Sequence, residues 1–218
     1  MSPYTLSALV ITLIGGTGLV IHSSLPRTGR IRAGFFCFYT NLSNLLVVLY
    51  ELALFLSAAL GGGIMLRSLT DGTVAMSMAA CIWITHIIYH FVLLRDFKRS
   101  GGTFADSAGE AVGNFCVHYV TPLLVLLQWL LWADKAALTV WSAAAWLLIP
   151  LAYFIFAMLR AKTGRPIGNT KLLYPYPFLD LPRLGPKRFW LGVGRLVLFC
   201  LALGLVLVGI GRLAMLLK

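Results

Sequence analysis

The chain has 218 residues, of which 60% are hydrophobic and only 11% are charged. A soluble domain carries about 25% charged residues, so this composition excludes an ordinary soluble protein and indicates one embedded in a membrane. The formal net charge is +11. This excess does not predict nucleic-acid binding, because the basic residues gather in particular loops, where we expect them to contact anionic membrane lipids.

Six apolar stretches are each long enough to cross a bilayer as a helix, which takes about 20 residues. They lie near residues 4–25, 34–60, 73–95, 112–132, 138–160 and 188–217. Because they leave no room for a soluble domain, the sequence predicts an all-α, polytopic membrane protein with one six-helix transmembrane domain over residues 1–218. The first stretch lacks a basic leading segment and a small-residue cleavage site, so we expect a retained helix rather than a signal peptide.

The loops differ in their content of Lys and Arg, and this difference predicts the orientation. Three basic residues follow the first stretch, three follow the third, and seven lie between the fifth and sixth. These thirteen are Arg27, Arg30, Arg32, Arg95, Lys98, Arg99, Arg160, Lys162, Arg165, Lys171, Arg183, Lys187 and Arg188. Only Arg67, Lys135, Arg212 and Lys218 fall on the other side. The positive-inside rule then places loops 1, 3 and 5 in the cytoplasm and both termini outside.

Hydrogen-bonding side chains inside the stretches gather at one depth, near the predicted cytoplasmic end. An unpaired polar group in a bilayer costs several kcal/mol, so such residues usually face one another or a wet cavity. Thr40 and His118 each lie six residues into their stretches, about 9 Å below the interface at ~1.5 Å per residue. The full set is Thr40, Asn41, Asn44, His86, His90, Asn114, His118 and Arg195. Glu51 and Gln128 lie toward the opposite face and are predicted to be outside this cluster.

Helical spacing places these polar residues on single faces. Thr40 and Asn44 are four residues apart, as are Asn114 and His118, and such pairs share a helix face. His86 and His90 repeat the pattern in the third stretch. Pro122 removes the amide that would bond to the His118 carbonyl, so a kink is expected there.

The residues allow several chemical interpretations. Asn41 and Asn44 are typical of polar contacts that hold membrane helices together. His86 and His90 have the spacing of a metal pair, and His pairs on two helices also suit haem. However, no carboxylate or thiolate completes a shell, and we expect no metal or cofactor. The four cysteines fall in four different stretches and are expected to be buried hydrophobes: Cys37, Cys81, Cys116 and Cys200.

Thr40 and His118 at matching depth suit a nucleophile and its general base. In a hydrolase of this kind, a lipid ester would arrive from the bilayer and water from the cytoplasm. The alternative is a transporter or channel in which His86, His90, His118 and Arg195 relay protons or anions. No inverted repeat is evident between the halves, which argues against a transporter. The residues alone leave the two classes equally open.

Three segments resemble one family of membrane proteins. They are FCFYTNLSNLLVVLY from Phe36, NFCVHYVTPLLVLLQWLLW from Asn114 and YPYPFLD from Tyr174. They are similar to segments of Pr6Pr-type bacterial membrane proteins, which in turn resemble the androgen-induced gene and androgen-dependent TFPI-regulating protein family. The similarity covers all six spans in order and is specific in these three segments.

This resemblance implies a multi-pass threonine hydrolase that cleaves fatty acid esters of hydroxy fatty acids, here in a bacterial cytoplasmic membrane. The family's nucleophilic Thr matches Thr40, and its essential His matches His118. The Asn four residues before that His matches Asn114. Animal members carry an Asp where Asn44 stands.

The family's aromatic-Tyr-Pro-Phe-Leu-acid string matches residues 176–180, in the fifth loop. Prolines at alternate positions prevent a regular helix. The aromatic residues suit an interfacial belt, or alternatively a lid in which Tyr176 and Phe178 contact substrate and Asp180 orients His86, His90 or Arg195. Arg195 itself either extends to the interface or binds a substrate carboxylate.

Overall fold

The computed structural model describes residues 1–94 and 108–216, and these contain no β-strand. In this part of the chain, six helical segments are long and apolar enough to cross a membrane, which confirms the predicted all-α, multi-pass architecture. They are Pro3–His22, Tyr39–Ala59, Gly72–Leu93, Ala111–Trp132, Val140–Lys162 and Pro186–Leu216. Of the basic residues used above, Arg95, Lys98, Arg99 and Lys218 lie outside the described residues.

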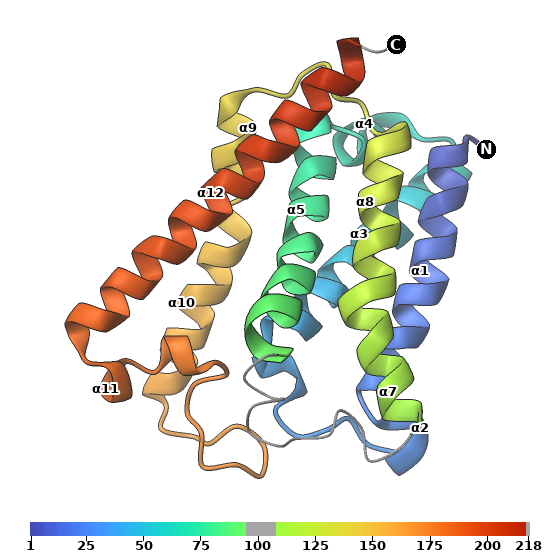
Figure 1. Cartoon of the computed structure of the whole chain (residues 1–218). Helices are drawn as coiled ribbons and strands as arrows, with labels where there is room; N and C mark the ends of the chain where they lie inside the picture. The colour runs from blue at the N-terminus through green and yellow to red at the C-terminus, as the bar shows by residue number, and fades with distance from the viewer. Residues whose placement is uncertain (95–107, 217–218) are drawn as a thin grey trace.

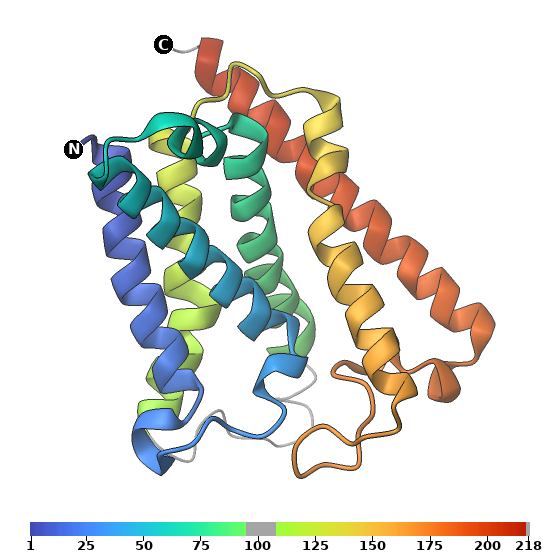
Figure 2. The same ribbon diagram turned by 180° about the vertical axis from the view of Figure 1, so that it is seen from behind.

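Four of the spans form a compact bundle, in which α1 (Pro3–His22) packs on α3 (Tyr39–Ala59) and α8 (Thr121–Trp132), and α5 (Gly72–Ile88) packs on α3 and α8. Beside them, α12 (Pro186–Leu216) packs on α5 and on α9 (Val140–Ala145). Figures 1 and 2 show α10 (Leu148–Lys162) and α12 set to one side of the bundle.

The two ends of the molecule differ in what they carry. Both chain termini and α4 (Gly63–Leu69) lie at one end, here called the terminal end (Figure 1). The short helices α2 (Leu25–Thr28) and α11 (Leu181–Leu184) lie at the other end, here called the α11 end. Loops 1 and 5 therefore share the α11 end, as the alternation of six spans requires.

The second span begins later than the sequence suggested. Gly34 has a left-handed backbone (φ +78°) and is followed by a short 3₁₀ turn, η1 (Phe35–Cys37). An added Cβ at Gly34 would lie 2.7 Å from Ile167 Cγ2, so both the conformation and the packing require glycine. Helix α3 starts only at Tyr39, and Thr40 therefore lies in its first turn rather than six residues inside a helix.

Two spans contain a π-helical turn at the α11 end. The third continues from α5 into η2 (Tyr89–Leu93), and the fourth runs from α7 (Ala108–Phe115) through η3 (Cys116–Val120) into α8. Pro122 is the second residue after η3, so the irregularity expected at this proline takes the form of a wide helical turn. Such π-helical turns are found frequently at functional sites.

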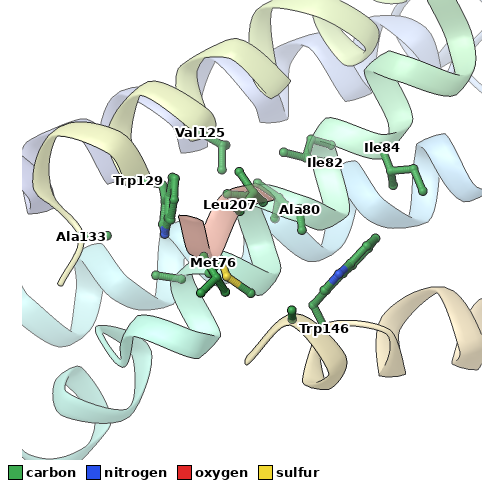
Figure 3. Close-up of a cluster of buried hydrophobic side chains, with 14 of the residues drawn as sticks. Met76, Ala80, Ile82, Ile84, Val125, Trp129, Ala133, Trp146 and Leu207 are labelled. Carbon is green, nitrogen blue, oxygen red and sulfur yellow. The ribbon is translucent and has the colours of Figure 1, made fainter. Parts of the chain in front are cut away.

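The fifth span is broken into α9 and α10 (Leu148–Lys162). Pro150 has no amide hydrogen to donate to the Trp146 carbonyl, which explains a break at this point. The Trp146 ring is fully buried, and its Nε1 donates to the Cys200 carbonyl of α12 at 3.1 Å. Figure 3 shows Trp146 in the core cluster with Met76, Trp129 and Leu207. The bundle core thus fixes α12 to α5 and α9, while α10 packs in a separate cluster that contains Ala157, Tyr176 and Leu179.

Candidate active site

Thr40 and His118 meet at the α11 end of the bundle. The Thr40 Oγ1 atom lies 3.3 Å from His118 Nε2, across 78 positions of sequence. Thr40 is in the first turn of α3, and His118 is in the π-helical turn η3. Their side chains are 8% and 5% exposed, so little water competes for the contact.

The partners of His118 determine which of its nitrogens carries the proton. Its Nδ1 atom lies 2.9 Å from the Asn114 carbonyl oxygen, which can only accept a hydrogen bond. Nδ1 must therefore hold the proton, and in the neutral ring Nε2 is left as an acceptor. An unprotonated Nε2 facing a hydroxyl is the arrangement that a general base needs.

Tyr89 positions the His118 ring from the other side. The two rings are stacked, with centroids 3.6 Å apart and planes 20° from parallel. Asn114 donates through Nδ2 to the Tyr89 hydroxyl, so one residue of α7 holds both rings, through its side chain and through its carbonyl. Tyr89 was not predicted, because an aromatic residue beside His90 in an apolar helix does not stand out.

His86 supports the backbone of His118 rather than its ring. His86 Nδ1 donates to the His118 carbonyl at 2.9 Å. Pro122 cannot supply an amide to this carbonyl, so the imidazole replaces a missing backbone donor. His86 also stacks on Trp83, with ring centroids 4.8 Å apart. These contacts give His86 an orienting position behind the Thr40–His118 pair.

Asn44 and Asn41 fix the backbone around Thr40. Asn44 Nδ2 donates to the Thr40 carbonyl at 2.8 Å and to the Val117 carbonyl at 3.0 Å, and thereby joins α3 to η3. Asn41 Nδ2 donates to the Phe35 carbonyl at 2.7 Å and holds the 3₁₀ turn on α3. The Oδ1 atoms of both amides are buried without a hydrogen-bond partner within the described residues. Both side chains therefore hold the backbone around Thr40 in place.

Thr40 lies where two cavities meet. The first, here called the vestibule, has a volume of about 740 Å³ and is lined by Thr40, His118, His22, Arg32 and Tyr176 among others. The second, here called the apolar pocket, has a volume of about 70 Å³ and is lined by residues of α3, α5, α10, α12 and the fifth loop. Its lining includes Ile84, Leu196, Phe154 and Phe178. A space whose lining includes charged and polar side chains thus opens on one side of the hydroxyl, and an apolar space on the other.

Tyr176 lines both cavities and is nearly buried. Its ring stacks on Phe178, with centroids 5.1 Å apart and planes 4° from parallel, and packs edge-on against Tyr153. Its hydroxyl is close enough to Thr40 to interact with both the side chain and the backbone of that residue. Burial raises the pKa of Tyr176, although these hydrogen bonds act in the opposite direction, so the hydroxyl stays protonated at neutral pH.

Three predicted site residues are not brought into this arrangement. Arg195 is exposed on α12 and lines neither cavity. Asp180 caps α11, where its Oδ1 accepts from the Arg183 amide at 3.1 Å. His90 is exposed, and its Nδ1 lies 2.9 Å from the Tyr119 hydroxyl. Although His86 and His90 are stacked at 5.8 Å, the described residues contain no group of three or more His, Cys, Asp or Glu that would hold a metal ion.

Comparison with known proteins adds no relative to this picture. No protein-family model, curated protein or solved structure matches the chain. Inference about function therefore rests on the geometry of the Thr40–His118 pair and its cavities, together with the resemblance of the three short segments.

Proposed function

We propose that the protein is an intramembrane hydrolase of lipid or fatty-acyl esters that uses Thr40 as nucleophile and His118 as general base. One observation carries the proposal: the Thr40 hydroxyl faces the nitrogen of His118 that must be unprotonated, because the other nitrogen donates to the Asn114 carbonyl. A threonine hydroxyl is a weak nucleophile until such a base takes its proton.

The reaction takes place in two halves. Thr40 Oγ1 attacks the ester carbonyl while its proton passes to His118 Nε2, and the tetrahedral intermediate collapses when His118 returns that proton to the leaving alcohol. The product of this half is an acyl-threonine ester. Water from the vestibule then attacks the acyl carbon, His118 again takes a proton, and Thr40 leaves with that proton as the acid is released.

The first turn of α3 offers stabilisation for the oxyanion. The amides at the start of an α-helix have no intrahelical partner, and they carry a partial positive charge. The amides of Tyr39 and Thr40 are in this turn, next to the nucleophilic oxygen, and both interact with the Tyr176 hydroxyl. When a substrate carbonyl displaces that hydroxyl, the two amides and Tyr176 become donors to the developing negative charge.

The cavities favour an ester with an apolar acyl group. The apolar pocket beside Thr40 is lined mostly by aliphatic and aromatic side chains, whereas the vestibule contains Arg32 and His22. The first carbons of the acyl chain match the apolar pocket, and a polar or carboxylate-bearing alcohol part matches the vestibule. Fatty acid esters of hydroxy fatty acids, the substrate class implied by the resemblance, have both parts.

We place the α11 end on the cytoplasmic side of a bacterial inner membrane, because loops 1 and 5 carry Arg27, Arg32, Arg160 and Lys171 at that end. The test is thiol labelling of Asn169→Cys in a protein whose four native cysteines are replaced by Ala. Labelling by a membrane-impermeant maleimide should require permeabilised cells. Ile64→Cys at the terminal end is the matched control and should react in intact cells, and the reverse pattern would invert the orientation.

The catalytic proposal is tested by ester hydrolysis with the purified protein in detergent. The wild-type protein and Thr40→Ser should cleave a long-chain acyl ester, and Thr40→Ala should not. Thr12→Ala, which removes a threonine hydroxyl of α1 that bonds to the Ala8 carbonyl, is the matched control and should retain full activity. Undiminished hydrolysis by Thr40→Ala would refute the assignment of the nucleophile, and proton-coupled flux in liposomes without hydrolysis would favour a transporter.

A further inference from the structure

We propose that a groove between α3 and α10 binds the hydrocarbon chain of the substrate and admits it sideways from the bilayer to Thr40. This groove, here called the lateral groove, has a volume of about 420 Å³. Its apolar lining consists of Leu42, Leu46, Leu148, Ile149, Ala152 and Phe156. The proposal rests on the proposed hydrolase function and specifies how its substrate reaches the nucleophile.

The groove lies where α10 meets α3 through side chains such as Tyr153 and Tyr39, while the two helices do not pack along their length. The core contacts of this part of the chain join α12 to α5 and α9, and Pro150 and the break after α9 separate α10 from that packing. Figure 2 shows α10 running beside α3 without covering it. The space between the two helices is therefore lined by side chains from both and is open to the outside.

The occupant follows from the surroundings of the groove. Both walls are membrane-spanning helices, so what lies outside them is the hydrocarbon region of the bilayer. Leu46, Leu148 and Phe156 are 38%, 67% and 40% exposed, which leaves the groove mouth apolar. Ser43, the polar residue in the lining, is buried and bonds to Thr85 at 2.9 Å and to the Thr40 carbonyl. A hydrocarbon chain is the ligand that matches such walls.

Two tyrosines form the wall that the lateral groove shares with the apolar pocket. Tyr39 and Tyr153 line both spaces, and their rings meet edge-to-face with centroids 5.1 Å apart. Each hydroxyl is tied to a backbone carbonyl: Tyr153 to Cys37 at 2.9 Å, and Tyr39 to Cys81 at 3.3 Å. Tyr39 immediately precedes Thr40 in the chain. The bilayer and the nucleophile are thus separated by the side chains of Tyr39 and Tyr153 and not by backbone.

This arrangement separates the routes of the two reactants. Water reaches Thr40 from the vestibule, while a chain from the bilayer reaches it through the lateral groove and past the two tyrosines. Filling the groove should therefore slow the hydrolysis of esters that have a long chain, and leave short, water-soluble esters unaffected because they enter through the vestibule.

The kinetic test is Ala152→Phe, which adds a ring within the groove. For a 16-carbon acyl ester of nitrophenol, kcat/KM should fall by about tenfold or more, whereas the four-carbon ester should change less than about twofold. Ala202→Phe is the matched control, because Ala202 is an exposed alanine of α12 that lines none of the three spaces, and it should affect neither ester. Equal loss on both esters, or on neither, would overturn the proposal.

A binding test separates this proposal from the proposed function. Palmitic acid bearing a chain-terminal diazirine, incorporated in phosphatidylcholine vesicles with the wild-type protein, should label α3 and α10 at groove residues such as Ile149 and Phe156 in preference to exposed residues of α12. Labelling spread evenly over all lipid-facing helices would contradict the groove as a binding site. If the protein hydrolyses neither ester, the hydrolase fails, but the labelling still decides whether the groove holds a chain.

Discussion

The same two spans build a buried polar pair at each end of the bundle. At the α11 end, Thr40 of α3 meets His118 of the fourth span at 3.3 Å. At the terminal end, Glu51 of α3 meets Gln128 of the same fourth span at 2.9 Å. All four side chains are buried, and Glu51 is 0% exposed. By burial and hydrogen bonding alone, the two pairs are equivalent.

The two pairs differ in whether a cavity reaches them and in whether the helix backbone around them is regular. Neither Glu51 nor Gln128 lines any of the three spaces described above, and the helices around them are regular. Thr40 lies between two cavities, and His118 is in a π-helical turn. A buried polar pair that no cavity reaches is thus expected to hold membrane helices together and to do no chemistry. The Glu51–Gln128 pair is therefore an internal control for the Thr40–His118 pair.

The largest expected effect concerns His118. His118→Ala should lower kcat for ester hydrolysis by about 10³-fold or more, and Thr40→Ala combined with it should add little, because a nucleophile and its base act as a unit. The measurement is single-turnover hydrolysis by proteins whose thermal unfolding matches the wild type. If the losses of the two single variants multiply in the double variant, the two residues do not act together.

A smaller loss is expected at Tyr89, which positions His118 without touching substrate in the proposed reaction. Tyr89→Leu removes the stacked ring and should lower kcat by about 10- to 100-fold with little change in KM. Tyr89→Phe keeps the ring and should restore most of this loss. A purely structural role would give parallel changes in melting temperature, so kcat and thermal unfolding are measured on both variants.

A change of only several-fold is expected from the basic residues. Arg32 lines the vestibule and Arg195 does not, so Arg32→Gln should raise KM for carboxylate-bearing esters by about fivefold and leave neutral esters unchanged. Arg195→Gln should leave both unchanged. If Arg195→Gln instead gives the selective rise in KM, the carboxylate binds at α12 and not in the vestibule.

The terminal-end pair should affect stability and not catalysis. Gln128→Leu leaves the buried Glu51 carboxyl without its donor and should lower the free energy of unfolding by about 1–2 kcal/mol. Activity per folded molecule should stay within about twofold of wild type, because Gln128 contributes to none of the cavities. Loss of activity in fully folded Gln128→Leu would show that the two ends are coupled.

The sequence predicted the fold because hydropathy alone determines which segments can span a bilayer. The sequence also predicted that Thr40 and His118 lie at one depth, since the number of residues along a helix gives the distance from its end. The 3.3 Å contact between Thr40 and His118 could not be predicted in this way. It depends on the left-handed Gly34 and on the 3₁₀ turn, which set where α3 begins. Loop conformations of this kind have no periodic signal, so Thr40 was expected deeper in its helix.

Two further features depended on how helices are rotated against one another. Arg195 was expected either to face the cavity or to reach the interface, because large apolar residues occur on every side of α12 and do not indicate which face meets the bundle. Tyr89 was missed for a related reason, because its stacking on His118 follows from π-helical turns in both the third and fourth spans. Periodicity at 3.6 residues per turn does not describe such turns.

Covalent trapping of the nucleophile tests the central claim most directly. A fluorophosphonate bearing an alkyl chain should phosphonylate Thr40 with loss of fluoride, and peptide mass spectrometry should locate the adduct on the segment that contains Thr40. The adduct should be present in the wild-type protein and in Gln128→Leu, and absent in Thr40→Ala and His118→Ala. An adduct on another residue, or one of equal yield in Thr40→Ala, would contradict the assignment of Thr40 as the nucleophile.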